Sequence, residues 1–147
     1  IVHRPKATNK NLNTFGLMVT DGEVYLETTS TTYGTSVALS GSDLRSPLDT
    51  WHHFVGVYDG SEIRMYLDGT EVPLFQEPVT GTLETNAFPL TIGCRHGAGF
   101  TDHIDDGVVD EVRLYNVALT DQQIADLHTY DSGPGFTANG SEKMQYC

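Results

Sequence analysis

Apolar and polar residues alternate along most of this chain, which is the pattern of half-buried β-strands. The candidate strands cover residues 12–19, 23–27, 36–39, 51–58, 63–67, 90–94 and 108–115. Asp-Gly pairs at 21–22, 59–60 and 68–69 separate alternating segments. This dipeptide favours tight hairpin turns, because both of its residues tolerate positive φ. The pattern therefore predicts antiparallel strands joined by short turns.

The clearest alternation lies in residues 51–58, where Trp51, His53, Val55 and Val57 share one face. Because Trp51 opens an alternating strand, we expect its side chain in the core. His53 lies on the same face, and we expect it to be a core histidine with its hydrogen bonds satisfied.

One helix is predicted near residues 121–128. Thr120 and Gln123 have the spacing of a capping box, and Ile124 and Leu127 follow as a buried stripe. Many short strands, frequent turns and one short helix predict an all-β fold, an antiparallel two-sheet β-sandwich. The 147 residues fit a single domain over 1–147, with an irregular tail over 131–147.

The charge of the chain narrows the classes of partner. Lys and Arg number 8 against 20 Asp and Glu, a net charge of −12. Nucleic-acid binding needs a basic face, so it is not expected, and neither is an anionic membrane surface. No apolar run approaches the roughly 20 residues that span a bilayer, so no membrane insertion is expected. The acidity fits a soluble extracellular protein or one whose carboxylates bind Ca²⁺.

Cys94 and Cys147 are the two cysteines, and their spacing matches neither a zinc ribbon nor a redox pair. In an acidic chain rich in Thr and Gly, they suggest one disulfide formed in an oxidising compartment. Two free thiols are the alternative.

Two longer stretches carry a family pattern. The first is Trp51-His-His-Phe-Val-Gly-Val-Tyr-Asp-Gly with the Tyr-Leu-Asp-Gly hairpin at 66–69. The second is Asp106-Gly-Val-Val-Asp-Glu-Val-Arg-Leu-Tyr-Asn, which comes before the short helix. Together, over residues 15–127, they resemble the laminin-G-like (concanavalin A-like) jelly-roll domain.

The resemblance implies a two-sheet jelly roll, and a role in binding glycans or proteins outside cells or at their surface. It also implies a Ca²⁺ site at one rim in many members. Members normally carry further strands before the position that matches Ile1, and we expect these to be lacking here. Open sheet edges would then invite self-association or strand donation.

Four aspartates are the candidate metal ligands. On a strand over 108–115, Asp110 would share an apolar face with Val108, Val112 and Leu114, where a carboxylate is costly unless it is paired or bound to metal. Asp110 therefore either binds Ca²⁺ or braces loops by hydrogen bonds. Asp102, Asp105 and Asp106 precede it in a loop that could supply further oxygens, or that is simply an exposed acidic loop. Glu111 and Arg113 would form a charge pair.

Candidate ligand-binding residues are Tyr33, Phe100 and His96, which lie in or near predicted loops. Exposed aromatic rings in such loops would stack on sugar rings. His96 and His103 also offer a possible transition-metal site beside the acidic loop.

No catalytic motif is found. The Glu-x-Asp-x-x-Glu strand of jelly-roll glycosidases is absent, and residues 110 and 111 would place their acids on opposite faces. The best prediction is a secreted or surface-displayed, non-catalytic module that recognises carbohydrate or a matrix protein, assisted by Ca²⁺. A structural subunit of a strand-sharing filament or coat is the alternative, followed by a fragment of a polysaccharide-active enzyme.

Overall fold

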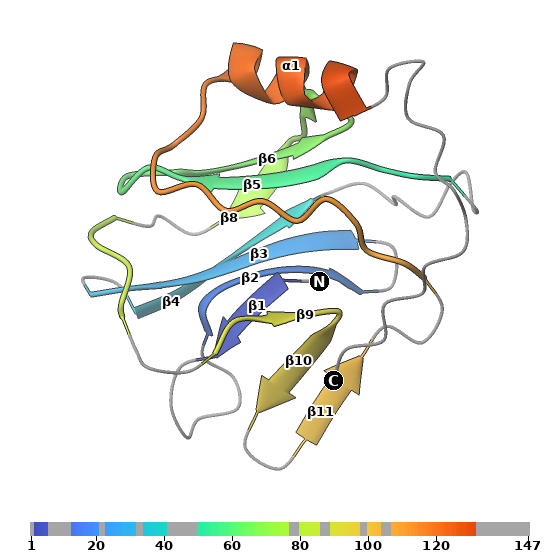
Figure 1. Ribbon diagram of the computed structural model, residues 1–147. Coiled ribbons are helices and arrows are strands. Elements are labelled where there is room, and N and C mark those ends of the chain that lie inside the picture. The colour runs from blue at the N-terminus through green and yellow to red at the C-terminus, as the bar shows by residue number, and fades with distance from the viewer. Residues whose placement is uncertain are drawn as a thin grey trace.

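The computed structural model describes residues 2–5, 13–20, 23–31, 34–40, 50–76, 80–85, 89–97, 100–103 and 107–131, which form eleven strands and one helix (Figure 1). The strands are β1 (Val2–Pro5), β2 (Asn13–Thr20), β3 (Glu23–Ser30), β4 (Gly34–Ser40), β5 (Phe54–Tyr58), β6 (Ile63–Leu67), β7 (Thr70–Glu71), β8 (Leu74–Gln76), β9 (Thr91–Ile92), β10 (Cys94–Gly97) and β11 (Phe100–His103). The helix is α1 (Asp121–Asp131).

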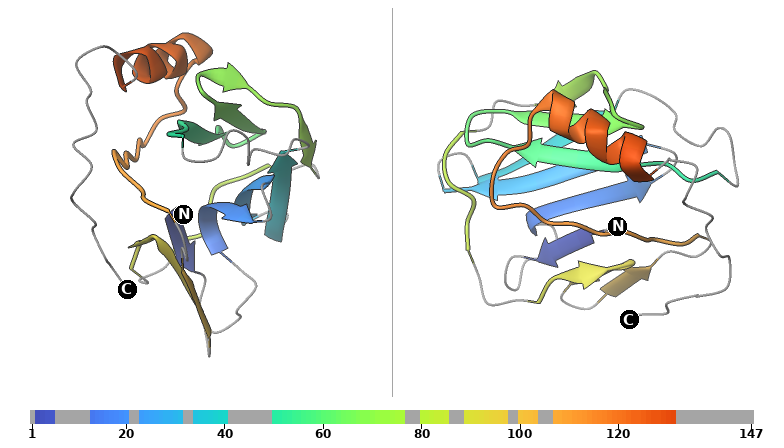
Figure 2. Two further views of the ribbon diagram at one scale, coloured as in Figure 1. Left: turned by 90° about the vertical axis from the view of Figure 1, so that its right-hand side faces the viewer. Right: turned by 45° about the horizontal axis from the view of Figure 1, so that its top comes forward.

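The strands form three antiparallel sheets. The largest has the order β8-β4-β3-β2-β1-β9, the second has the order β5-β6-β7, and β10 pairs with β11 as a hairpin. Figure 2 shows the β5-β6-β7 sheet between the six-stranded sheet and α1, so both of its faces are covered. The predicted all-β jelly-roll sandwich with one short helix is therefore confirmed.

Successive side chains of β6 point alternately toward the six-stranded sheet and toward α1. Ile63 and Met65 face the six-stranded sheet, where they pack against Val24 and Leu26 of β3. Tyr66 has the opposite parity and packs beneath α1 with Val57, Leu119 and Ile124. The latter four are at most 9% exposed, so the helix is fixed by apolar burial as well as by its cap.

A glycine allows the two sheets to approach each other at the centre of β5. A Cβ added to Gly56 would lie 2.9 Å from Leu26 Cδ2 and 3.0 Å from Leu26 Cδ1. Any side chain at position 56 would therefore push β3 and β5 apart, or force Leu26 into another rotamer.

The hairpin turn between β6 and β7 follows the Asp-Gly prediction. Leu67 pairs with Thr70, which leaves Asp68 and Gly69 as a two-residue loop with φ of 50° and 77°. Positive φ at both positions is the geometry that this dipeptide favours. The capping box is also confirmed, because Thr120 N donates to Gln123 Oε1 at 2.9 Å and Gln123 N donates to Thr120 Oγ1 at 3.3 Å.

The strand predicted over 108–115 is not formed. Residues 107–118, hereafter the flank segment, belong to no strand and pass the sandwich as an exposed stretch (Figures 1 and 2). Glu111 adopts a left-handed φ of 51°, which breaks the extended backbone that pairing requires. Five of its apolar side chains are exposed: Val108, Val112, Leu114, Tyr115 and Val117.

Two further predictions in the 90–107 region need correction. The strand expected over 90–94 is split at Gly93, whose φ of 78° ends β9 after Ile92 and lets β10 begin at Cys94. The following residues were expected to be a loop, but β10 and β11 pair there from Cys94–His103 to Gly97–Phe100. Among the described residues, no helix is both long and apolar enough to cross a membrane.

Candidate functional site

A corner of the molecule brings three histidines around the Asp68 carboxylate. We define this histidine corner as His52, His53, Asp68 and His128. His53 N donates to Asp68 Oδ1 at 2.9 Å, and His52 Nδ1 lies 2.9 Å from Asp68 Oδ2. Asp68 N donates in turn to His53 O at 2.9 Å. The chain entering β5 is therefore fixed to the β6–β7 turn through both backbone and side chain.

The helix completes the corner. The rings of His53 and His128 stack with centroids 5.7 Å apart and an interplanar angle of 26°. Gly69 makes room for this contact, since a Cβ there would lie 3.2 Å from His128 Cβ. The β6–β7 turn, the start of β5 and the last turns of α1 therefore meet at one point, and none can move independently.

The electrostatics of the corner centre on Asp68. Burial raises the pKa of its carboxyl, but the hydrogen bonds from His53 N and His52 outweigh that effect, and the pKa lies below its ordinary value. The attraction of His52 and His128 acts in the same direction. Asp68 is therefore held in its charged form and serves as a fixed acceptor.

Trp51 lies at this corner but not in the core, so its predicted burial is wrong. Trp51 comes before β5, which begins at Phe54, and it is 55% exposed. On the face that alternation assigned to the core, Trp51 is exposed, and the next residue, His53, is half-buried with its ring stacked on His128 of α1. The only tryptophan of the chain thus presents a flat apolar ring to solvent. Two residues further along, the backbone is held by the hydrogen bond from His53 N to Asp68.

A second polar network joins the sheet to the first turn of α1. Tyr66 OH donates to Asp121 Oδ1 at 2.7 Å, and Arg64 donates to the same oxygen at 2.8 Å. Burial, together with the Asp121 hydrogen bond, raises the pKa of Tyr66 to about 12. Arg64 Nη1 also donates to Tyr66 OH at 2.7 Å, so these three side chains bind one another, which indicates a structural role.

The predicted metal ligands are not gathered by the described part of the chain. Asp110 lies in the flank segment, exposed, with Oδ1 accepting from Glu111 N at 2.7 Å. Its predicted position on a buried apolar strand face is therefore wrong. Asp102 lies on β11 without a described side chain, and Asp105 and Asp106 lie outside the described residues. Among the described side chains, no three His, Cys, Asp or Glu converge as a metal site.

The predicted ligand-binding residues fall mostly outside the described side chains. His96 lies on β10 and Phe100 on β11, so both belong to the hairpin and not to a loop. Tyr33 lies outside the described residues. Their roles in binding stay predictions.

The remaining pairings have different outcomes. The predicted charge pair is confirmed, with Arg113 Nη2 2.7 Å from Glu111 Oε2. Cys94 is buried at the start of β10, and Cys147 lies outside the described residues, so the predicted disulfide stays a prediction.

Sequence reasoning missed Trp51 and Asp68 as parts of one site. Asp68 was recognised only as a turn residue, since nothing local indicates that its carboxylate reaches back 15 residues to His53. The only available signal for Trp51 was its position at the very start of an alternating segment, where a residue can precede the paired strand.

Comparison with known proteins gives two findings. The profile of a family described as the Concanavalin A-like lectin/glucanases superfamily matches residues 1–125. Among solved structures, the chain is similar to an S-layer domain-containing protein, residues 221–444, from Clostridium thermocellum ATCC 27405, with 20% identity and a TM-score of 0.46. That likeness covers 84% of this chain and 59% of the other. No curated protein matches.

Proposed function

Because this chain belongs to the Concanavalin A-like lectin/glucanases superfamily, we propose that it is a non-catalytic extracellular module that binds carbohydrate through a site centred on Trp51. A sugar ring has an apolar C–H face, and an exposed indole offers the flat surface on which that face stacks. The observation that carries the proposal is the 55% exposure of Trp51.

Preorganisation supports the same site. Two hydrogen bonds, from His53 N to the Asp68 carboxylate and from Asp68 N to His53 O, hold the chain next to Trp51 before any ligand arrives. Ligand binding then costs less conformational entropy, because this part of the chain is already ordered. A matrix protein is the alternative ligand, since an exposed tryptophan is also a common anchor in protein interfaces.

Binding to polysaccharides tests the proposal. We expect the full chain to be retarded in gels that contain a recognised soluble polysaccharide, and Trp51→Ala to lose at least tenfold in affinity. Trp51→Phe keeps an aromatic face and should retain part of the affinity, whereas Tyr130→Ala, at a residue 75% exposed on α1, should retain all of it. Equal affinity of Trp51→Ala and the parent chain would contradict the proposal, and release of reducing sugar would favour the enzyme alternative.

Ca²⁺ is a second, separable part of the proposal. The stretch that holds Asp102, Asp105 and Asp106 is rich in the carboxylate oxygens that Ca²⁺ prefers. Binding to the folded state alone would stabilise it by about 2.7 kcal/mol at a hundredfold excess over Kd. A thermal melt with Ca²⁺ and with EDTA should show this shift, and no shift in Asp106→Asn; identical melts of the parent chain would exclude a Ca²⁺ role.

A further inference from the structure

The open edge of β5 is a second surface with unused binding capacity. Within the described residues, β5 pairs with β6 alone. His53 O accepts from Asp68 N, and Asp59 N donates to Glu62 O at 3.3 Å. Because hydrogen-bonded partners alternate in an antiparallel pair, odd-numbered β5 residues bond to β6. The N–H and C=O groups of Phe54, Gly56 and Tyr58 therefore point away from β6.

The exposure of β5 agrees with this geometry. Gly56 is exposed although its two neighbours, Val55 and Val57, pack under α1. A glycine has only backbone to expose, so its peptide groups are the accessible surface at this edge. Unpaired backbone of this kind is a template for an added strand.

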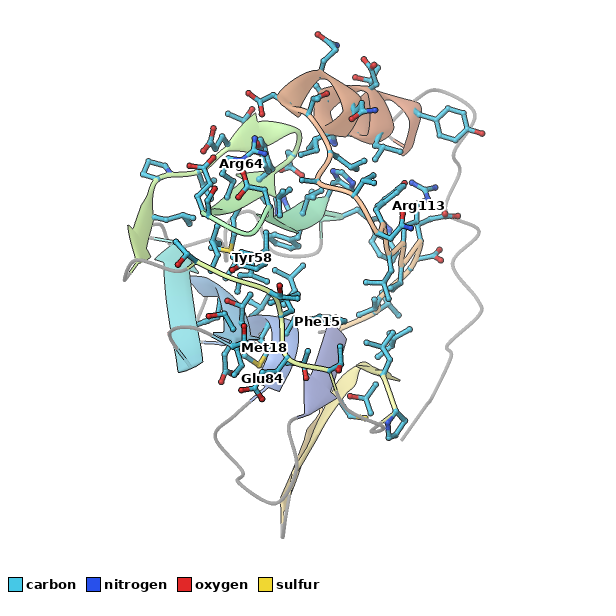
Figure 3. The ribbon with its side chains drawn as sticks, turned by 90° about the vertical axis from the view of Figure 1, so that its left-hand side faces the viewer. Phe15, Met18, Tyr58, Arg64, Glu84 and Arg113 are labelled. Carbon is cyan, nitrogen blue, oxygen red and sulfur yellow. The ribbon has the colours of Figure 1, made fainter. Side chains whose placement is uncertain are left out.

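The flank segment runs past β5 on the side opposite β6 (Figures 1 and 2) without pairing to it. In Figure 3, Arg113 lies on this segment, on the other side of the view from Arg64 and Tyr58. Val108 is 58% exposed and Leu114 60% exposed, so the segment adds apolar side chains beside the open backbone edge.

The charges along this edge indicate the kind of strand that fits. Asp59, directly after β5, and Asp110, on the flank segment, are exposed carboxylates, whereas Glu111 is already paired with Arg113. The chain as a whole carries −12, so a second copy would bring repulsion to the contact. A neutral or basic strand would bring attraction.

We propose that the β5 edge and the flank segment accept an extended peptide strand from another protein, with alternating apolar residues and a neutral or basic charge. Main-chain hydrogen bonds to the outward groups of Phe54, Gly56 and Tyr58 provide the affinity, and Val108 and Leu114 contact alternate side chains of the ligand. This surface is independent of the Trp51 site.

The test uses a synthetic nine-residue peptide of alternating Val and Thr with terminal lysines, added to the full chain. Hydrogen exchange should show new protection at Phe54, Gly56 and Tyr58, while Val55 and Val57 are protected before addition. Two further peptides carry methyl groups on alternate backbone nitrogens, one on the odd and one on the even positions. One of them should bind at least tenfold more weakly, because its methyl groups block the N–H groups that face β5. A version with glutamates for lysines should also bind more weakly at low salt.

A matched pair of variants locates the contact. Leu114→Lys changes an exposed residue of the flank segment and should weaken binding of the basic peptide at least fivefold, whereas Tyr130→Lys, exposed on α1, should leave it unchanged. Absence of binding, or equal binding of both methylated peptides and the parent peptide, would overturn the proposal. A dimer in light scattering that protects the same three amides without peptide would also overturn it, in favour of a second copy.

Discussion

The hydroxyl of Tyr66 donates a 2.7 Å hydrogen bond to the carboxylate of Asp121, and through it the inner sheet is tied to the first turn of α1. Tyr66 is 2% exposed, while Asp121 stands at the surface. The pair therefore crosses the boundary between core and solvent. It complements the burial of Ile124, which is fully covered one turn further along the helix.

Tyr66→Phe should destabilise the fold by about 1 kcal/mol, the typical net value of one intramolecular hydrogen bond. Because the pKa of Tyr66 is raised to about 12, its contribution is complete below the ordinary pKa near 10 and is lost as the pH rises toward 12. Urea unfolding between pH 7 and 12 should show the parent chain converging on Tyr66→Phe. Tyr115→Phe, at an exposed residue, should not change stability at pH 7.

Asp68→Asn tests the histidine corner. The pKa of Asp68 is lowered in the fold, so its contribution is present above the ordinary value near 3.9 and is lost as the pH falls further, through the native pKa. The side chain is 37% exposed, and solvent screening limits the expected loss at pH 7 to about 1 kcal/mol. Thermal melts should show this difference shrinking below about pH 4.

The control for that experiment is Asp126→Asn, on the exposed side of α1. Its free energy of unfolding should stay within about 0.5 kcal/mol of that of the parent chain at every pH. A stability difference for Asp68→Asn that stays constant down to pH 2 would mean that the carboxylate charge contributes nothing to the corner.

Gly56→Ala should destabilise the fold by about 1–2 kcal/mol, because the new methyl group meets the Leu26 side chain at 2.9 Å. The double variant Leu26→Val, Gly56→Ala should lose less stability than the two single variants lose together, since the shorter side chain removes the overlap. Gly93→Ala provides the contrast. Its cost comes from a φ of 78°, with nothing within 4 Å, so no neighbouring substitution should relieve it.

Asp110→Ala should change stability by no more than about 0.5 kcal/mol, because the carboxylate is exposed and, within the described part of the chain, accepts a hydrogen bond only from its neighbour Glu111 N. A denaturant titration measures this directly. A loss above about 2 kcal/mol would mean that residues 108–115 are a buried strand after all, with Asp110 facing the core.

Local chemistry explains why some elements could be predicted from the sequence. The turn at Asp68 and Gly69 needs positive φ at adjacent residues, and the capping box of Thr120 and Gln123 is closed within one helical turn. Such features depend on few neighbours, so the residues that make them are visible in the sequence.

Features that depend on distant partners were less accessible. The flank segment has the composition of a strand, but a strand also needs a neighbour to complete its hydrogen bonds, and composition does not identify one. The alternation that begins at Trp51 places His53 on the same face as Val55, which packs toward α1, yet it does not show that pairing with β6 starts only at Phe54. The candidate site therefore emerges from the contact between β5, the β6–β7 turn and α1.

Fluorescence of the single tryptophan tests the central claim most directly. With no ligand, Trp51 should emit as a solvent-exposed indole and be quenched readily by iodide. Titration with an oligosaccharide from a recognised polysaccharide should shift its emission and protect it from iodide, with the midpoint at the Kd found by calorimetry. Calorimetric binding with no change in either signal would place the carbohydrate site away from Trp51 and contradict the account.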